Sequence, residues 1–141
     1  MSVFTAKALE IISGASDAKK AIVDIVTPAL PKIHVMSNMV LVASYIRPER
    51  SAGGIYRPKT NVEEDQWQGK VGLILKTGPQ AFVSDDSYEF HPHDIPAVGD
   101  WVVYRIGDAW EVLVNGTTKI SCRMVRDNSI RMKVTDPEVI F

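Results

Sequence analysis

The sequence predicts a mainly β domain, built as a small Greek-key β-barrel that follows a short helical segment. From residue 35 onward, apolar residues recur at the spacing of strands, and the runs are short and separated by Gly, Pro, Asn and Asp. Before residue 35 the apolar spacing is that of helices. The chain has 141 residues, 45% of them hydrophobic, enough for one core plus an appendage. We therefore expect a helical extension over 1–35 and the barrel over 36–141.

The extension is predicted to hold two short amphipathic helices and a proline-containing linker. Ser16-Asp17 can cap the second helix, and Thr27-Pro28 ends it. A strand is the alternative for this second run, because it is rich in Ile and Val. The apolar positions are Ala6, Leu9 and Ile12 in the first run and Ala18, Ile22, Ile25 and Val26 in the second.

Several short strands are predicted in the second part. They cover residues 39–42, 71–75, 101–106, 110–114, 117–125 and 130–134. Asn115-Gly116 between two such runs predicts a hairpin with a type I′ turn, in which both residues have a positive φ. Gly107-Asp108 marks another turn, and Asp136-Pro137 closes the domain. Many short strands without intervening helices are typical of a small barrel.

Two connections are unusually long, and such loops are commonly functional or disordered. In the first, residues 47–68, two glycines precede an apolar pair, and acidic and amide residues follow. We interpret this as a tethered hook whose pocket is supplied by a partner. The alternative is a hairpin turn at the two glycines with an ordinary strand after it. The hook residues are Gly53, Gly54, Ile55, Tyr56, Arg57 and Pro58.

The second long connection, residues 80–97, carries aromatic side chains that can pack it down. These are Phe82, Tyr88 and Phe90, and Asp85-Asp86 suits the tip of a turn.

Four motifs in order resemble the GroES family of co-chaperonins over residues 36–134. The hook resembles the mobile loop of the family, and the strand at 71–75 with Gly78-Pro79 resembles the strand after that loop. Val98-Gly99-Asp100 resembles the family's entry into the next strand, and Met39-Val40-Leu41-Val42 occupies the place of its first core strand. The resemblance implies a barrel with a mobile loop and a second loop that roofs a ring.

The resemblance also implies partners. Family members form seven-membered rings that cap a chaperonin ring, and the chaperonin binds and hydrolyses ATP. The first and last strands pair between neighbouring subunits, which would cover open sheet edges. Carried over to this chain, the subunit interface would comprise Val40, Leu41 and Val42 on one side and Ile130, Met132 and Val134 on the other.

A second hypothesis uses the same fold as a structural subunit. The third apolar position of the family's hook is Arg57 here, and short family members lack the extension at 1–35. Such departures are expected of a bacteriophage relative. The chain would then be a decoration or joining protein, bound to a viral capsid protein through its N-terminal arm.

Composition argues against other classes of partner. The net charge is −1, which favours neither nucleic acid nor an anionic membrane. No run of about 20 apolar residues is present, and residues 1–13 make a poor signal peptide. The single cysteine, Cys122, is expected to be a buried, inert thiol rather than a catalytic one. We expect a soluble protein of the cytoplasm.

Two clusters of polar residues are candidates for chemistry. His91-Pro92-His93-Asp94 offers three potential metal ligands, but it lacks thiolates and a fourth ligand, so polar turn residues are the preferred interpretation. The adjacent carboxylates Glu63, Glu64 and Asp65 are expected to be a solvated acidic stretch. No phosphate-binding or nucleophile motif is present. We therefore predict a non-enzymatic protein without metal or cofactor.

Overall fold

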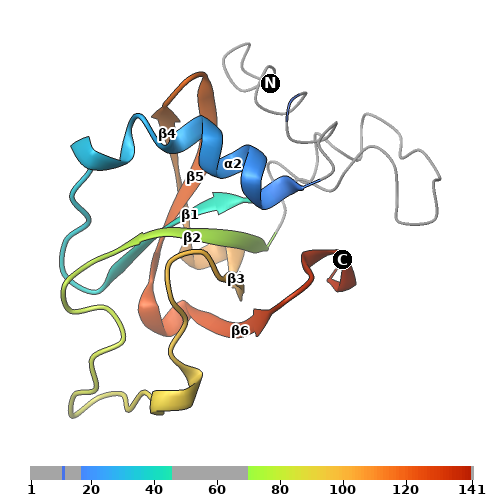
Figure 1. The fold of residues 1–141 in the computed structure, drawn as a ribbon. Helices are drawn as coiled ribbons and strands as arrows, with labels where there is room; N and C mark the ends of the chain where they lie inside the picture. The colour runs from blue at the N-terminus through green and yellow to red at the C-terminus, as the bar shows by residue number, and fades with distance from the viewer. Residues whose placement is uncertain (1–10, 12–16, 46–69, 141) are drawn as a thin grey trace.

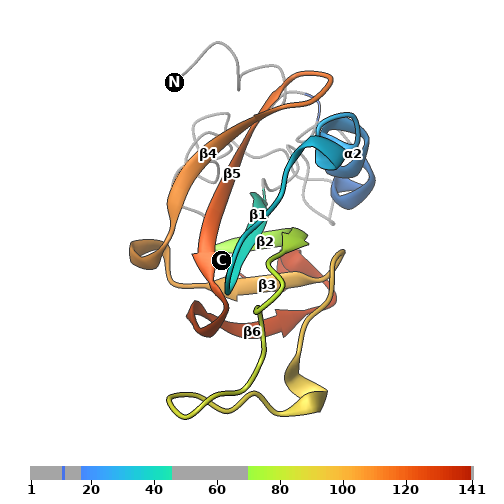
Figure 2. The same cartoon turned by 90° about the vertical axis from the view of Figure 1, so that its left-hand side faces the viewer.

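The fold is a six-stranded antiparallel sheet with one helix packed on it (Figures 1 and 2). It is taken from a computed structural model that describes residues 11, 17–45 and 70–140. The helix is α2 (Ala18–Val26), and the strands are β1 (Met39–Ser44), β2 (Val71–Thr77), β3 (Trp101–Tyr104), β4 (Trp110–Asn115), β5 (Lys119–Arg126) and β6 (Ile130–Val134).

The strand order is β4-β5-β1-β2-β3-β6, and every neighbouring pair is antiparallel. This confirms the prediction of a mainly β fold. Within the described part of the chain, β4 and β6 each have a neighbour on one side only. The closed Greek-key barrel stays a prediction.

Helix α2 forms as the sequence predicts. The side chain of Asp17 accepts a hydrogen bond of 3.2 Å from the backbone N–H of Lys20, which caps the first turn. Beyond the last residue of the helix, the hydroxyl of Thr27 donates to the carbonyl of Val23 at 2.6 Å, and Pro28 follows. The strand alternative for this run is therefore wrong. Of the first predicted helix, only residue 11 is described.

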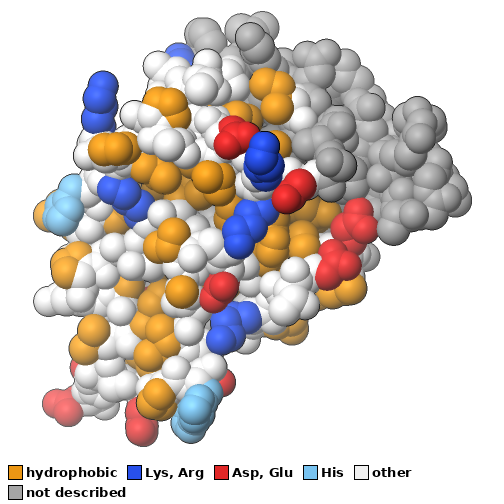
Figure 3. Space-filling model, in the orientation of Figure 1, with side chains coloured by type: hydrophobic (Ala, Val, Ile, Leu, Met, Phe, Trp, Pro, Cys, Tyr) orange, Lys and Arg blue, Asp and Glu red, His pale blue; other side chains and the backbone are white. Residues whose placement is uncertain are grey.

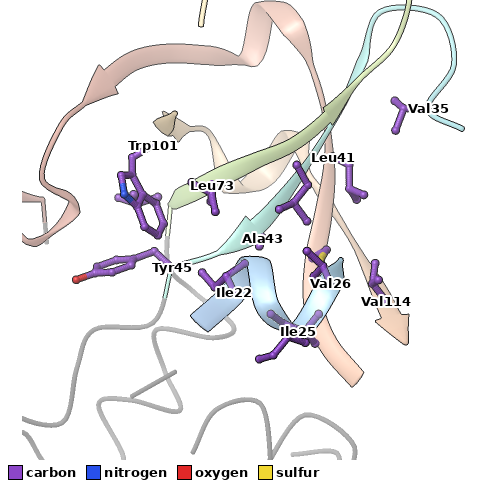
Figure 4. Close-up of a cluster of buried hydrophobic side chains, with 14 residues drawn as sticks. Ile22, Ile25, Val26, Val35, Leu41, Ala43, Tyr45, Leu73, Trp101 and Val114 are labelled. Carbon is purple, nitrogen blue, oxygen red and sulfur yellow. The ribbon is translucent and has the colours of Figure 1, made fainter. Parts of the chain in front are cut away.

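Helix α2 belongs to the main core. Ile22, Ile25 and Val26 are at most 2% exposed and belong to the same buried cluster as side chains of the sheet (Figure 4). Val35, in the segment after the helix, lies in the same cluster. Residues 18–35 are therefore packed on the sheet through their apolar face. The division into an extension over 1–35 and a domain over 36–141 stays a prediction.

The sheet has a hydrophobic cluster on each side. Along β1, the side chains of Leu41 and Ala43 belong to the α2 side, and those of Val40 and Val42 belong to the opposite side. The opposite side is covered by the connection between β2 and β3, which contributes Phe82. Residues of the two sides alternate along β1, so the predicted strand period is confirmed for this strand.

The predicted hairpin of β4 and β5 forms, but its turn is not type I′. Asn115 pairs with Lys119, and neither Asn115 nor Gly116 has a positive φ. The tip instead meets the end of α2, where the N–H of Thr117 donates to the carbonyl of Ile25 at 2.9 Å. A Cβ on Gly116 would overlap that carbonyl oxygen. The glycine is therefore required by a close approach to the helix.

The remaining strands are close to their predicted bounds. Strand β3 ends at Tyr104, two residues earlier than predicted, because Ile106–Asp108 forms a 3₁₀ turn. Strand β6 has the predicted bounds. After it, Asp136 caps a last 3₁₀ turn, Pro137–Val139, by accepting from the N–H of Glu138 at 3.0 Å.

The connection between β2 and β3 packs through its aromatic residues, as predicted. Phe82 and Phe90 meet edge to face, with ring centroids 5.6 Å apart, and Tyr88 lies against Phe90. Asp85 accepts hydrogen bonds from Ser87 and from the N–H of Tyr88, which makes the predicted turn. The side-chain hydrogen bond from Ser87 is the main reason that the pKa of Asp85 is lowered.

Candidate functional site

The hook connection starts and ends at adjacent points in the middle of the sheet. Ser44, at the end of β1, pairs with Gly72 near the start of β2. The N–H of Tyr45 donates to the carbonyl of Val71 at 2.9 Å, two residues before the connection begins. The residues predicted to dock, Gly53, Gly54, Ile55, Tyr56, Arg57 and Pro58, lie outside the described residues.

Two aromatic side chains fix the base of this connection. Tyr45 is 1% exposed and meets Trp101 of β3 edge to face, with ring centroids 5.1 Å apart (Figure 4). Leu73 of β2 is fully buried in the same cluster. Large buried aromatic side chains contribute strongly to packing energy. The two ends of the connection are therefore held by the core of the domain.

A buried arginine lies on the other side of the sheet. Arg123 of β5 is 5% exposed and donates to the hydroxyl of Tyr104 at 3.0 Å. Burial raises the pKa of Tyr104, and the positive charge of Arg123 opposes that shift. Sequence reasoning missed this pair. The available signal was a charged residue in the middle of the otherwise apolar run of β5.

The predicted interface residues divide into two groups. Val40, Leu41 and Val42 are at most 2% exposed, and β1 lies between β2 and β5. The expectation that β1 is an open sheet edge is wrong, because β5 pairs with it along its length. Of the other group, Met132 is 50% exposed, and Ile130 and Val134 are half-buried on the edge strand β6.

The structure places β4 at the other edge of the sheet, which the sequence did not indicate. Trp110 is 55% exposed and Leu113 is 41% exposed on this strand. The alternating pattern predicted the strand and its hairpin. It held no information on which strand of the hairpin lies at the edge.

An apolar groove of about 700 Å³ lies beside β4. Its walls come from the segment after α2 and from β1, β4 and β5, and they include Met36, Met39 and Met124. Figure 3 shows hydrophobic side chains at the surface near α2 and over the connection between β2 and β3. Methionine side chains adapt to varied apolar partners.

The candidate metal ligands are not gathered into a cluster in the described part of the chain. His91 and His93 are exposed, with ring centroids 5.2 Å apart, and no group of three or more His, Cys, Asp or Glu is gathered among the described residues. Burial raises the pKa of the Cys122 thiol to about 12. The carboxylates Glu63, Glu64 and Asp65 lie outside the described residues.

Within the described residues, no helix is long and apolar enough to cross a membrane. Comparison with the models of known protein families and with curated proteins found no match to this chain. Its function is therefore inferred from its own motifs and geometry.

Proposed function

We propose that this chain is a co-chaperonin-like lid that caps a chaperonin ring and assists ATP-dependent protein folding. The partner would bind the ATP. One observation carries the proposal: the connection that holds the Gly-Gly-Ile-Tyr hook leaves and re-enters the sheet at two hydrogen-bonded strands in its centre. A partner that binds a docking segment at this place would be connected directly to the core of the domain.

The order of elements supports the same proposal. Strand β1 is followed by the hook connection, then by β2 with Gly78-Pro79, the aromatic connection, and β3. The Val-Gly-Asp motif before β3 has a structural reason, since Gly99 has a φ of +94°. The side chain of Asp100 accepts from the N–H of Ala97 at 2.8 Å. Glycine is favoured at such a φ, and aspartate closes the turn.

The hook would bind by burying Ile55 and Tyr56 in a pocket of the partner. Ordering the segment costs conformational entropy, so a single hook binds weakly. Several hooks on one ring turn later contacts into intramolecular ones, and this raises apparent affinity by ~10²–10⁴-fold. Arg57 requires a carboxylate on the partner, because an unpaired buried guanidinium is costly.

The same proposal covers the finer features of the fold. The sheet would be a GroES-like Greek-key barrel that stays open between β4 and β6, and the chains would assemble as a ring of seven. The connection between β2 and β3 would form the roof of that ring. Its support is the packing of Phe82 and Phe90 on the sheet and the turn at Asp85.

Native mass spectrometry of the chain with a chaperonin ring, with and without ATP, tests the proposal. The wild type should bind only with ATP, and Ile55→Asp should lose binding by at least ~10-fold per hook, since it places a charge in an apolar pocket. Val83→Asp is the matched control. Val83 is 57% exposed on the other long connection, so this variant should bind as the wild type does.

Failure of the wild type to bind any chaperonin with ATP would overturn the lid proposal. The structural-subunit hypothesis would then be tested by stoichiometric presence in purified virus particles. The N-terminal arm of that hypothesis is shorter than the sequence indicated, because α2 is committed to the core.

A further inference from the structure

The two edge strands of the sheet carry opposite charges. Strand β4 has the exposed carboxylate of Glu111, which accepts a hydrogen bond of 3.4 Å from the hydroxyl of Ser121. Strand β6 has Arg131 and Lys133, both exposed. Lys133 donates to the backbone carbonyl of His93 at 3.3 Å. Each edge strand also has a large apolar side chain that is at least half exposed, Trp110 on β4 and Met132 on β6.

Charged and apolar residues occupy the same sides on both strands. On β4, Val112 packs against the α2 cluster, and Trp110 points to that side since it lies two residues away. On β6, Val134 packs against the α2 cluster, and Met132 shares its side. Glu111 and Lys133 therefore point to the opposite side of the sheet, where Leu113 of β4 also lies.

We propose that β4 of one copy pairs antiparallel with β6 of a second copy, so that the sheet continues from chain to chain. One register matches three pairs by face and by chemistry. It places Trp110 opposite Val134, Glu111 opposite Lys133, and Val112 opposite Met132. Before Met132 the register of β6 against β3 shifts, so the match ends there.

The direction of the strands permits this pairing to repeat. Six strands that alternate in direction give edges that run antiparallel to each other. A copy added at β4 through its β6 therefore keeps the orientation of the first copy, and its own β4 stays open. Such head-to-tail contacts form closed rings or filaments. Figures 1 and 2 place β4 and β6 on opposite sides of the central strands, which favours pairing between chains over pairing within one.

Charge favours this head-to-tail pairing of β4 with β6 over a two-fold pairing of two β6 strands. Pairing two β6 strands would bring Arg131 and Lys133 of both copies together, and like charges directly opposite each other are destabilising. The mixed pairing places a carboxylate against an ammonium group. It also covers Trp110 and Met132, which are about half exposed in the single chain. Open strand edges are commonly covered in natural proteins, because they otherwise pair without control.

This inference rests on the proposed function, because it names the contact between subunits of the proposed ring. The contact lies at β4 and β6 and does not involve β1.

Reversal of charges on the two edge strands tests the proposed pairing. Sedimentation of the full chain should show an oligomer, and Glu111→Lys and Lys133→Glu should each weaken assembly by at least ~10-fold, because each puts like charges opposite each other. The double variant should recover assembly to within a few-fold of the wild type. Asp86→Lys, the same change at an exposed turn, should leave assembly unchanged.

Unfolding of each variant in urea is measured in parallel, so that loss of assembly is separated from loss of folding. The pairing is overturned if the wild type is a monomer at ~100 µM, if the single reversals do not weaken assembly, or if the double variant stays dissociated. These outcomes are independent of the chaperonin experiment. A folded monomer that still binds a chaperonin with ATP would leave the lid proposal standing and remove this contact.

Discussion

The two sides of the sheet are covered in different ways. On one side, helix α2 buries Ile22, Ile25 and Val26 against the strands. On the other side, an irregular connection places Phe82 on the sheet, with a positive φ of 62°. The N–H of Phe82 donates to the buried carboxylate of Asp127 at 3.0 Å. The first side is thus held by apolar burial, and the second is held to a larger extent by buried polar contacts.

Asp127 is the centre of those polar contacts. Its other carboxylate oxygen accepts from the side-chain amide of Asn38 at 3.3 Å and from the N–H of Asn128 at 2.7 Å. It therefore joins the start of β1, the connection and the turn after β5. A backbone conformation with φ near 62° is unfavourable for phenylalanine. The contacts that hold Phe82 in this conformation must therefore offset its free-energy cost.

The largest effect is expected on the helix side. Ile22→Ala should lower the free energy of unfolding by about 3 kcal/mol, because it leaves a cavity beneath α2. Urea unfolding at equilibrium measures this change. The sheet should not stay fully stable without this helix, in contrast to the expectation that residues 1–35 are an appendage.

Two valines on α2 provide a matched control. Val26 is fully buried, and Val23 is 38% exposed on the same helix. Val26→Ala should cost more than Val23→Ala by about 1–2 kcal/mol, since both changes alter helix propensity equally. Equal costs would mean that α2 does not cover the sheet.

A smaller effect is expected on the opposite side. Asp127→Ala should lower the free energy of unfolding by about 2 kcal/mol, because the N–H of Phe82 and the amide of Asn38 lose their acceptor. Asp86→Ala, at an exposed position of the same connection, should change it by less than ~0.5 kcal/mol. If the two variants were equally stable, the connection would be held by its aromatic residues alone.

This difference between the two sides explains what the sequence could predict. Helix α2 and all six strands follow from local periodicity, and Asp17 and Thr27-Pro28 mark the ends of the helix. The role of Asp127 does not follow, because its partners lie 45 and 89 residues away in the chain. The turn at Asn115-Gly116 shows the same limit, since a local rule demanded a positive φ where the actual constraint is the carbonyl of Ile25.

The candidate site was predictable to a different extent. The hook motif is local, and its residues were read directly from the sequence. The sheet edges are not local, because strand order depends on which segments pair. The family resemblance therefore implied an edge at β1, where the structure has a central strand, and the sequence did not indicate the edge at β4.

The smallest effect is expected from the buried thiol of Cys122. The pH dependence of stability that it causes measures how well water is excluded from the α2 side of the sheet. Burial raises its pKa from 9.0 to about 12, so the unfolded chain loses this proton at a lower pH than the folded chain does. Above pH 9 the unfolded state binds fewer protons, and stability must fall as the pH rises. Relative to Cys122→Ala, the wild type should lose about 0.8 kcal/mol between pH 7.5 and pH 9.5.

Urea unfolding of both proteins at the two pH values gives this difference, and the contributions of other titrating groups cancel in the comparison. Parallel pH dependence of the wild type and Cys122→Ala would mean that the thiol is hydrated beneath α2. The helix would then exclude water from the sheet no better than the irregular connection does on the other side. The hydrogen bonds of Asp127 would be the remaining difference between the two sides.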